Sequence, residues 1–376
     1  MSEFAAGPAG RIERVRALMA ERGYDAIVVR DEANLRWLTG VKGVFDYTFE
    51  FPHAAFITAD QCLFHTDSRY LNSFEENTSA GSPWVYDMDE GTIPGWVAGK
   101  IAANKCRVCA VEDDMQINFY QVIQRGLEDR SVACMLPLMH DDIRKMRAIK
   151  DAEEIELMRH AQSITDAAFQ HMLGYIKPGM TEKQVRNELE NFMFANGADS
   201  LAFGSIVASG PNTANPHAVP SDRVIEKGDF VLMDYGAGYC DYRSDMTRTV
   251  VMGEPTPEQL DLYALVRRTH EECVAAIHPG VEGNDIFKLS KKIIGDAGYG
   301  DYYNHGLGHG VGIDIHELPN FNRSKNIIEV GSVITMEPGV YLPGVGGVRL
   351  EDYGVVTENG YEPFTKTPHD LHVIDC

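Results

Sequence analysis

The stretch GDFVLMDYGAGYCDYRSDMTR, residues 228–248, is the one around which the rest of this chain is organised. Its apolar run from Phe230 to Met233 is typical of a buried strand, and it leads to the carboxylate of Asp234 and a glycine-containing turn. A second carboxylate, Asp245, follows on the next segment. Two buried carboxylates repel each other and lose hydration, so they need a compensating positive charge such as a metal ion. Because the chain has 56 Asp and Glu residues, the pair alone is a weak signal.

Composition sets the broad class of the protein. The 376 residues are enough for two domains with separate cores, and 44% hydrophobic and 24% charged residues are ordinary globular values. A net charge of -22 without a basic cluster argues against nucleic-acid binding. The N-terminus lacks the apolar core of a signal peptide, and nowhere do about 18 apolar residues run together. We therefore expect a cytoplasmic protein with no membrane partner.

The seven cysteines do not form the pattern of a disulfide framework, because their number is odd and their spacing wide. Cys106 and Cys109 have CxxC spacing, but no second pair accompanies them and the surrounding KCRVCAV is strand-like. We predict buried free thiols there.

Two domains are expected. Ile12, Val15, Leu18 and Met19 form a helical stripe, and residues 26–29 follow as a strand, which indicates an α/β N-terminal domain. From about residue 136 the pattern becomes charged and helical. This change places the boundary near residue 140, with a first domain at residues 1–140 and a second at residues 141–376.

The second domain contains an internal repeat. IKPGMTEKQV from Ile176 resembles IHPGVEGNDI from Ile277, and EKGDFVLMD, residues 226–234, resembles EVGSVITME, residues 329–337. Each first segment opens an amphipathic helix, and Thr181 with Gln184 forms a capping box in the first copy. Each second segment ends a strand on an acid, Asp234 or Glu337. The domain is therefore predicted to consist of two similar α+β halves.

The repeat also aligns the second acid of each half. SDMTRTVV with Asp245 falls opposite RLEDYGVV with Glu351. Pseudo-twofold packing of the halves would bring the four acids together. A solvated position for Glu337 is hard to reconcile with the apolar residues directly before it.

Candidate nitrogen ligands lie in HGLGHGVGIDIHELP, which holds His305, His309 and His316. Four glycines at residues 306, 308, 310 and 312 exclude a regular helix there, and neither HExxH nor a phosphate-binding loop is present. The glycines indicate a close approach of the backbone to a ligand.

These motifs together resemble the pita-bread metallopeptidases, the family of aminopeptidase P, prolidase and, more distantly, methionine aminopeptidase and creatinase. The resemblance runs from about residue 143 to the C-terminus, and its motifs appear in order: PHAVPSDR, MDYGA, SDMTRT, GHGVGIDIHE, MEPGVY and VRLEDYG. The N-terminal half, with NLRWLTG and DSRY, resembles the creatinase/prolidase-type N-terminal domain more loosely.

The resemblance implies a dinuclear metal site with Asp234, Asp245, His309, Glu337 and Glu351 as ligands, of which Asp245 and Glu351 would bridge the ions. Oxygen ligands with one imidazole suit Mn²⁺, although Co²⁺, Zn²⁺ or Fe²⁺ could occupy the same residues. Two ions lower the pKa of a shared water and polarise a carbonyl.

The resemblance also implies catalytic residues. His217 and His316 match substrate-facing histidines that would hold the developing oxyanion, and Glu337 would carry the proton from water to the leaving nitrogen. Arg349 lies two residues before Glu351 on the same strand face, so it is expected behind the acids, and His305 is expected beside the ligands or substrate.

Relatives with this domain layout cut the bond before proline, so the expected activity is that of an Xaa-Pro dipeptidase or an aminopeptidase acting on longer Xaa-Pro peptides. Two alternatives stay open at this point: a hydrolase of a small non-peptide amide, and a metal-free binding module. A homodimer is expected, in which the aromatic segment from Val44 to Pro52 could restrict a partner's cleft.

Overall fold

The computed structural model describes residues 7–42, 52–88, 91–322 and 325–376, and the aromatic residues 44–51 lie outside these ranges. The chain divides into two compact units, Met1–Arg147 and Ala148–Cys376. No helix in the described ranges is both long and apolar enough to cross a membrane. The seven cysteines are free thiols, and Cys106 and Cys109 are buried, which confirms the prediction for that pair.

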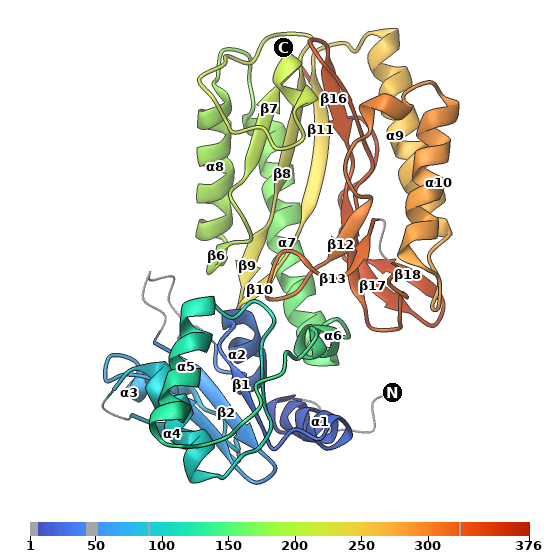
Figure 1. The fold of residues 1–376 in the computed structure, drawn as a ribbon. Helices are drawn as coiled ribbons and strands as arrows, with labels where there is room; N and C mark the ends of the chain where they lie inside the picture. The colour runs from blue at the N-terminus through green and yellow to red at the C-terminus, as the bar shows by residue number, and fades with distance from the viewer. Residues whose placement is uncertain (1–6, 43–51, 89–90, 323–324) are drawn as a thin grey trace. The chain divides into compact units, whose positions relative to one another are not determined.

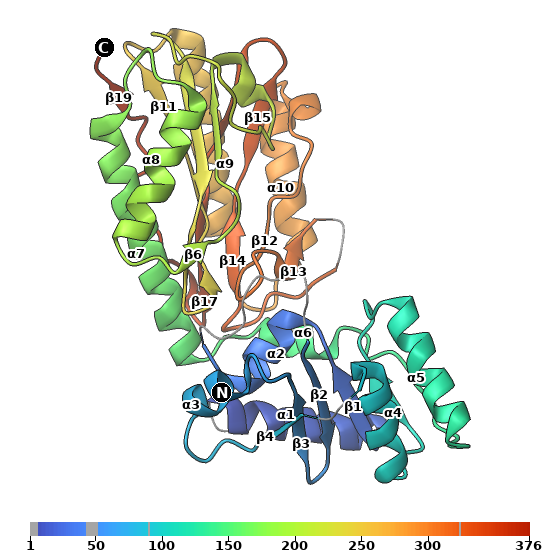
Figure 2. The same cartoon turned by 90° about the vertical axis from the view of Figure 1, so that its left-hand side faces the viewer.

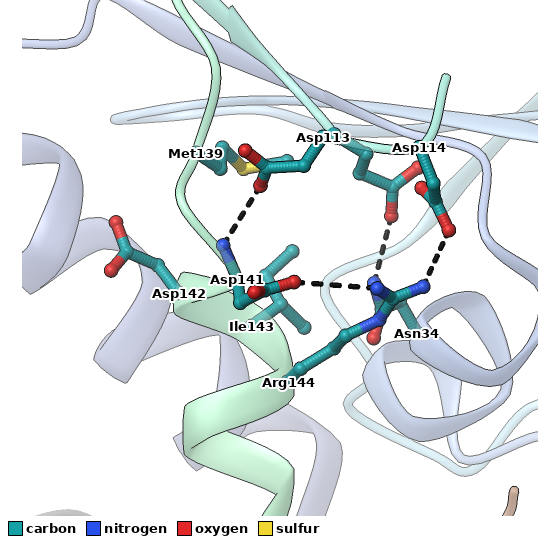
Figure 3. A pocket seen from close by; sticks show the side chains of 9 residues that line it. Asn34, Asp113, Asp114, Met139, Asp141, Asp142, Ile143 and Arg144 are labelled. Carbon is teal, nitrogen blue, oxygen red and sulfur yellow. Dashed lines mark hydrogen bonds and ion pairs between the residues drawn. The ribbon is translucent and has the colours of Figure 1, made fainter. Parts of the chain in front are cut away.

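The division between the units falls a few residues after the predicted boundary near residue 140. Helix α6 (Asp142–Arg147) belongs to the first unit because its basic side chains bind there. The Arg147 guanidinium donates to the Asn34 side chain at 2.8 Å. Arg144 is bonded to Asp114 and Asp141, as Figure 3 shows. A charged helical pattern marks where a helix begins, but it does not tell which unit the helix packs against.

The first unit is built on a five-stranded mixed sheet in the order β4-β3-β2-β1-β5, with helices around it. Its elements are α1 (Gly7–Arg22), β1 (Ala26–Val29), α2 (Glu32–Thr39), β2 (Ala54–Thr58), β3 (Cys62–His65), α3 (Leu71–Asn77), β4 (Val85–Asp87), α4 (Ile93–Ala103), β5 (Cys109–Val111), α5 (Ile117–Asp129) and α6. The predicted stripe and strand at the N-terminus are α1 and β1.

The second unit contains two main sheets, ordered β19-β11-β8-β7 and β13-β12-β14-β17-β18. The elements of its first half are α7 (Ala152–Tyr175), α8 (Glu182–Ala195), β6 (Ser200–Leu201), β7 (Ile206–Ser209), η1 (Gly210–Ala214), β8 (Phe230–Tyr235), β9 (Ala237–Tyr239), β10 (Tyr242–Arg243) and β11 (Met246–Met252). The elements after it are α9 (Pro257–Ala275), α10 (Gly283–Asp296), η2 (Gly300–Tyr302), β12 (Gly308–Gly310), β13 (Glu317–Phe321), β14 (Val333–Met336), β15 (Gly339–Leu342), β16 (Gly346–Arg349), β17 (Asp352–Thr357), β18 (Gly360–Pro363) and β19 (Val373–Ile374).

The internal repeat is visible in this order. Two helices precede an antiparallel pair in each half: α7 and α8 precede β8 with β11, and α9 and α10 precede β14 with β17. In Figures 1 and 2 the first helix pair covers one side of the strands and the second pair covers the other. The capping box of Thr181 and Gln184 begins α8, as predicted. The two-halved α+β fold expected of the pita-bread family is confirmed.

Strand β8 is buried on both faces, and this explains its nearly continuous apolar sequence. Val231, Met233 and Tyr235 pack into the core formed with α7 and α8. Phe230 packs into the core formed with α9. Asp234 and Phe230 are four residues apart on the strand, so their side chains point to the same face. The carboxylate of Asp234 therefore points away from the core formed with α7 and α8 and towards the second half.

Candidate metal centre

The four acids of the repeat are presented by equivalent strand ends. Asp234 is near the end of β8 and Asp245 immediately precedes β11, while Glu337 follows β14 and Glu351 immediately precedes β17. A β-bridge between Thr247 and Glu351 joins the two halves at this point. The fold therefore brings together acids that are far apart in the sequence.

His309, on β12, lies among these acids. Donor atoms of Asp245, His309 and Glu351 all lie within 4.8 Å of one another, and the three residues are buried. The His309 Nε2 atom is 3.6 Å from Asp245 Oδ2 and 3.5 Å from Glu337 Oε1. One nitrogen and several carboxylate oxygens thus converge on a common space.

The ring of His309 is oriented by its backbone neighbour. Its Nδ1 atom lies 3.0 Å from the carbonyl oxygen of Gly310. Because a carbonyl can only accept, Nδ1 carries the hydrogen, and Nε2 presents its lone pair towards the acids. Burial lowers the pKa of His309 to about 3, so the ring is neutral, as a metal ligand must be.

The acids repel one another in the absence of a cation at their centre. Burial, followed by the charges of neighbouring acids, raises the pKa of Asp245 and of Glu351 well above their ordinary values. Burial raises the pKa of Glu337 to about 8, although Arg349 opposes the shift. Within the described residues the buried Oδ1 atom of Asp234 has no hydrogen-bond partner. A cation at the centre of these acids would offset their repulsion and lower their pKa values.

Arg349 lies behind the acids, where the sequence places it. Its Nη2 atom donates to Asp234 Oδ2 at 2.5 Å, and its Nη1 atom donates to the Tyr341 hydroxyl at 2.8 Å. Its Nε atom lies 3.1 Å from the Thr247 hydroxyl, which donates to Glu351 Oε2 at 2.7 Å. One buried guanidinium therefore supports Asp234 directly and Glu351 through Thr247.

Sequence reasoning missed Thr247 and Tyr341. Thr247 lies two residues after Asp245, so strand alternation puts both on one face and could have identified it. Tyr341 lies on β15, whose partner β16 carries Arg349. The contact between Tyr341 and Arg349 depends on the register of the β15–β16 hairpin, and the sequence pattern does not reveal that register.

A cavity of about 460 Å³ opens beside the acids. His217 and His316 line it together with Asp234, Asp245, His309, Glu337 and Glu351. The rings of His309 and His316 meet edge to face, with centroids 4.2 Å apart. Seven of the nine residues singled out from the sequence thus share one cavity.

The other two, His305 and Arg349, do not line this cavity. His305 Nε2 is 2.9 Å from the Tyr341 hydroxyl, and its Nδ1 is 4.0 Å from Glu337 Oε2. His305 instead lines a separate cavity with Lys291 and Tyr303. Burial lowers its pKa to about 3, so the ring is a neutral contact behind Glu337.

The glycines around His309 allow strands to approach one another. A Cβ atom on Gly308 would lie 2.3 Å from the Thr335 carbonyl oxygen, and one on Gly310 would lie 2.2 Å from that of Leu318. The sequence led us to expect a close approach of the backbone to a ligand, whereas the close approach at these two glycines is to the backbone of the neighbouring strands β14 and β13. It holds the His309 backbone between β13 and β14.

Comparison with known proteins identifies the family. Residues 156–358 match the model of metallopeptidase family M24, and residues 11–149 match the creatinase/prolidase N-terminal domain. An Xaa-Pro dipeptidase of Pyrococcus horikoshii is 42% identical over 362 residues, which cover 96% of this chain and 98% of the relative. The structure of an Xaa-Pro dipeptidase from Bacillus anthracis aligns with a TM-score of 0.88 at 36% identity, covering 98% of this chain and 100% of that one. The structure of an X-Pro aminopeptidase from Thermotoga maritima aligns with a TM-score of 0.85 at 30% identity, covering 97% and 100%. With the paired acids of both halves converging on His309, this chain belongs to metallopeptidase family M24.

Proposed function

We propose that this protein is a metal-dependent peptidase that hydrolyses the bond before proline, in Xaa-Pro dipeptides or at the N-terminus of Xaa-Pro peptides. The observation that carries the proposal is a single cavity lined by four carboxylates, a neutral His309 and two further histidines. Relatives named Xaa-Pro dipeptidase and X-Pro aminopeptidase support the substrate class.

The residues present suit divalent ions. The buried Oδ1 atom of Asp234 has no hydrogen-bond partner among the described residues, and His309 offers an unprotonated Nε2 atom to the same space. Three carboxyl groups have raised pKa values there, which cations would reverse. We propose Asp234, Asp245, His309, Glu337 and Glu351 as the ligands of two ions, with Asp245 and Glu351 shared. The bound ions would supply an activated water and polarise the scissile carbonyl.

The remaining side chains of the cavity have roles that follow from their donor atoms. Burial lowers the pKa of His316, so its ring is neutral and can donate one hydrogen bond. We assign His316 and His217 to the carbonyl oxygen, where donors stabilise the developing negative charge. Glu337 borders both the cavity and His309, and it would accept the proton of the attacking water and deliver it to the leaving nitrogen.

An apolar part of the cavity wall supports recognition of proline. Phe203, Ile206, Val219 and Ile315 line the same cavity as the acids. The proline nitrogen carries no hydrogen and lies in a rigid ring, so hydrocarbon contact is the main recognition available around it. A wall of this kind suits the ring, and the carboxylates suit the reacting carbonyl.

The physiological metal, the oligomeric state and the location are further proposals. Oxygen-rich ligands with one imidazole favour Mn²⁺. The net charge of -22 disfavours nucleic-acid and anionic-membrane partners, and we propose a homodimer in the cytoplasm. Light scattering in solution tests the dimer, and activation profiles with Mn²⁺, Co²⁺, Zn²⁺ and Fe²⁺ test the metal.

The central test compares Mn²⁺-loaded protein on Xaa-Pro dipeptides, Xaa-Pro-Yaa tripeptides and the matched Xaa-Ala peptides. We expect hydrolysis of one or both proline series and little turnover of the alanine series. Asp245→Asn serves as the control, because it weakens a shared ligand while it preserves the volume of the side chain. Equal rates on proline and alanine peptides, or full activity after complete chelation, would contradict the proposal.

A further inference from the structure

A second group of metal-ligating side chains lies in the second unit, apart from the cavity. His270 comes from α9, Asp352 is the first residue of β17, and His369 lies in the segment between β18 and β19. One donor atom from each lies within 4.8 Å of the others. The rings of His270 and His369 meet edge to face, with centroids 4.6 Å apart.

His270 is the unusual member of this group. It is 1% exposed, and within the described part of the chain neither of its ring nitrogens has a hydrogen-bond partner. A buried polar group without a partner costs roughly 1–3 kcal/mol, so native proteins contain few of them. The Nε2 atom points towards the group, 3.6 Å from Asp352 Oδ2. Burial lowers the pKa of His270 to about 4, so the ring is neutral.

Asp352 is held rigidly with one oxygen turned to the histidines. Arg248 Nη2 donates to its Oδ1 atom at 2.7 Å, and Arg248 also donates to the carbonyl oxygens of Glu351 and Thr367 at 2.7 Å each. The Oδ2 atom is 2.6 Å from His369 Nε2. Outer contacts of this type fix a carboxylate ligand in orientation.

The distances suit one small cation after a modest adjustment. Nitrogen and oxygen ligands lie about 2.0–2.2 Å from Zn²⁺, which puts the donor atoms of a tetrahedral site roughly 3.4 Å apart. The 3.6 Å between His270 Nε2 and Asp352 Oδ2 already agrees with this spacing. The hydrogen bond between His369 and Asp352 would open, and the Nε2 hydrogen of His369 would pass through solvent to Nδ1, so that Nε2 presents its lone pair to the ion.

We propose that His270, Asp352 and His369 form a separate site for one Zn²⁺-like divalent transition-metal ion. Two imidazoles and one carboxylate are a donor set that Zn²⁺ accepts, with a fourth position open to water. His369 is partly exposed, so the ion and its water have access from solvent on that side. The positive charge of the adjacent Arg248 guanidinium repels a cation, so the ion must be held mainly by the two imidazole nitrogens. Borderline ions such as Zn²⁺ bind imidazole well, whereas Ca²⁺ and Mg²⁺ prefer oxygen ligands.

The site is distinct from the proposed peptidase centre, although the two are neighbours on β17. Glu351 and Asp352 are consecutive in extended backbone, so their side chains point to opposite faces. An ion bound to Asp352 would connect α9, β17 and the segment that leads to β19. The bound ion should stabilise the attachment of the C-terminal segment to α9 and β17. The inference does not depend on the proposed peptidase activity.

The test uses the full chain with Zn²⁺ alone, in the Asp245→Asn background, where the first site is weakened. His270→Gln and His369→Gln are the probes, because glutamine can pair with Asp352 and preserve the fold. His278→Ala is the matched control, since this exposed histidine lies just beyond α9 and outside the group. Zinc content after equilibrium dialysis and the Zn²⁺-dependent melting temperature are measured.

We expect the background and the His278→Ala protein to bind the additional ion and to melt at a higher temperature when it is bound. Either glutamine variant should bind the ion roughly 100-fold more weakly. Removing a residue that only supports a metal ligand already weakens metal affinity by about 10–100-fold, and loss of a ligand itself should cost at least as much. Co²⁺ should show the intense visible absorption of a low-coordinate site in the background protein and in the His278→Ala protein, but not in the glutamine variants. Folded glutamine variants with unchanged zinc affinity, or no additional ion at micromolar Zn²⁺, would overturn the proposal.

Discussion

Thr247→Val is the perturbation that most directly tests how the buried guanidinium supports the metal centre. The Thr247 hydroxyl is fully buried, donates to Glu351 Oε2 at 2.7 Å and lies 3.1 Å from Arg349 Nε. Valine keeps the shape and the strand preference but removes the hydroxyl. Glu351 then loses a hydrogen bond to its charged form, and Arg349 Nε loses its partner.

The magnitude follows from the type of contact. A hydrogen bond to a charged group contributes about 1.5–3 kcal/mol, and every 1.4 kcal/mol is a factor of about ten in affinity. Since ions bind Glu351 in its ionised form, the loss should appear as metal affinity weaker by roughly 10–100-fold, in the range seen when a contact behind a ligand is removed. Saturating Mn²⁺ should restore most of kcat, because no cavity-lining residue changes.

Thr249→Val is the matched control. Thr249 is also buried on β11, two residues further on, but its hydroxyl contacts only backbone among the described residues: it donates to the Arg349 carbonyl oxygen at 3.0 Å and accepts from the Arg349 N–H at 3.3 Å. Both variants should lose similar stability, whereas only Thr247→Val should shift the Mn²⁺ activation midpoint. Activity is measured against free Mn²⁺, and melting temperature by calorimetry. An unshifted midpoint for Thr247→Val, or equal shifts for both variants, would refute the reasoning.

Three further outcomes are expected. His316→Ala should lower kcat by roughly 10²-fold, the scale of one lost oxyanion donor, and should leave the metal content unchanged. His309→Ala should instead lose metal. Kinetics and metal analysis are measured on both variants, and the reverse pattern would exchange the two roles. In metal-free protein the pKa of Glu337 is raised from 4.5 to about 8, so its contribution favours the folded state at low pH and is lost as pH rises through that range. The change in melting temperature from pH 5 to pH 8 should therefore be more negative for chelated wild-type protein than for chelated Glu337→Gln protein, in which the buried histidines with lowered pKa still contribute. Saturating Mn²⁺ should reduce the difference between the two proteins. An equal pH dependence of the two chelated proteins would count against the clustered acids. Lys150→Met removes a buried ion pair in which Lys150 Nζ lies 3.0 Å from Glu317 Oε2. The free energy of unfolding, measured in urea, should fall by about 3–5 kcal/mol, because an unpaired charge is left buried. A fall below about 1 kcal/mol would show that the pair is not buried in solution.

The sequence predicted the repeated strands of the second domain, and the family resemblance supplied the proposed ligands. The apolar run before Asp234 and its copy before Glu337 reveal two equivalent strands that each end on an acid, because burial and strand period are local properties of the chain. The order of motifs adds His217, His309 and His316 by resemblance. These sequence patterns indicate which residues lie on the same face of a strand or helix.

The contacts behind the acids were decided only by the tertiary structure. Thr247 joins Glu351 across a bridge between the two halves, and Tyr341 meets Arg349 through the register of a hairpin. His270, Asp352 and His369 come from three elements with no common spacing. Such groups depend on how helices and sheets dock, and docking is set by side-chain packing over long sequence separations, which no local period in the sequence records.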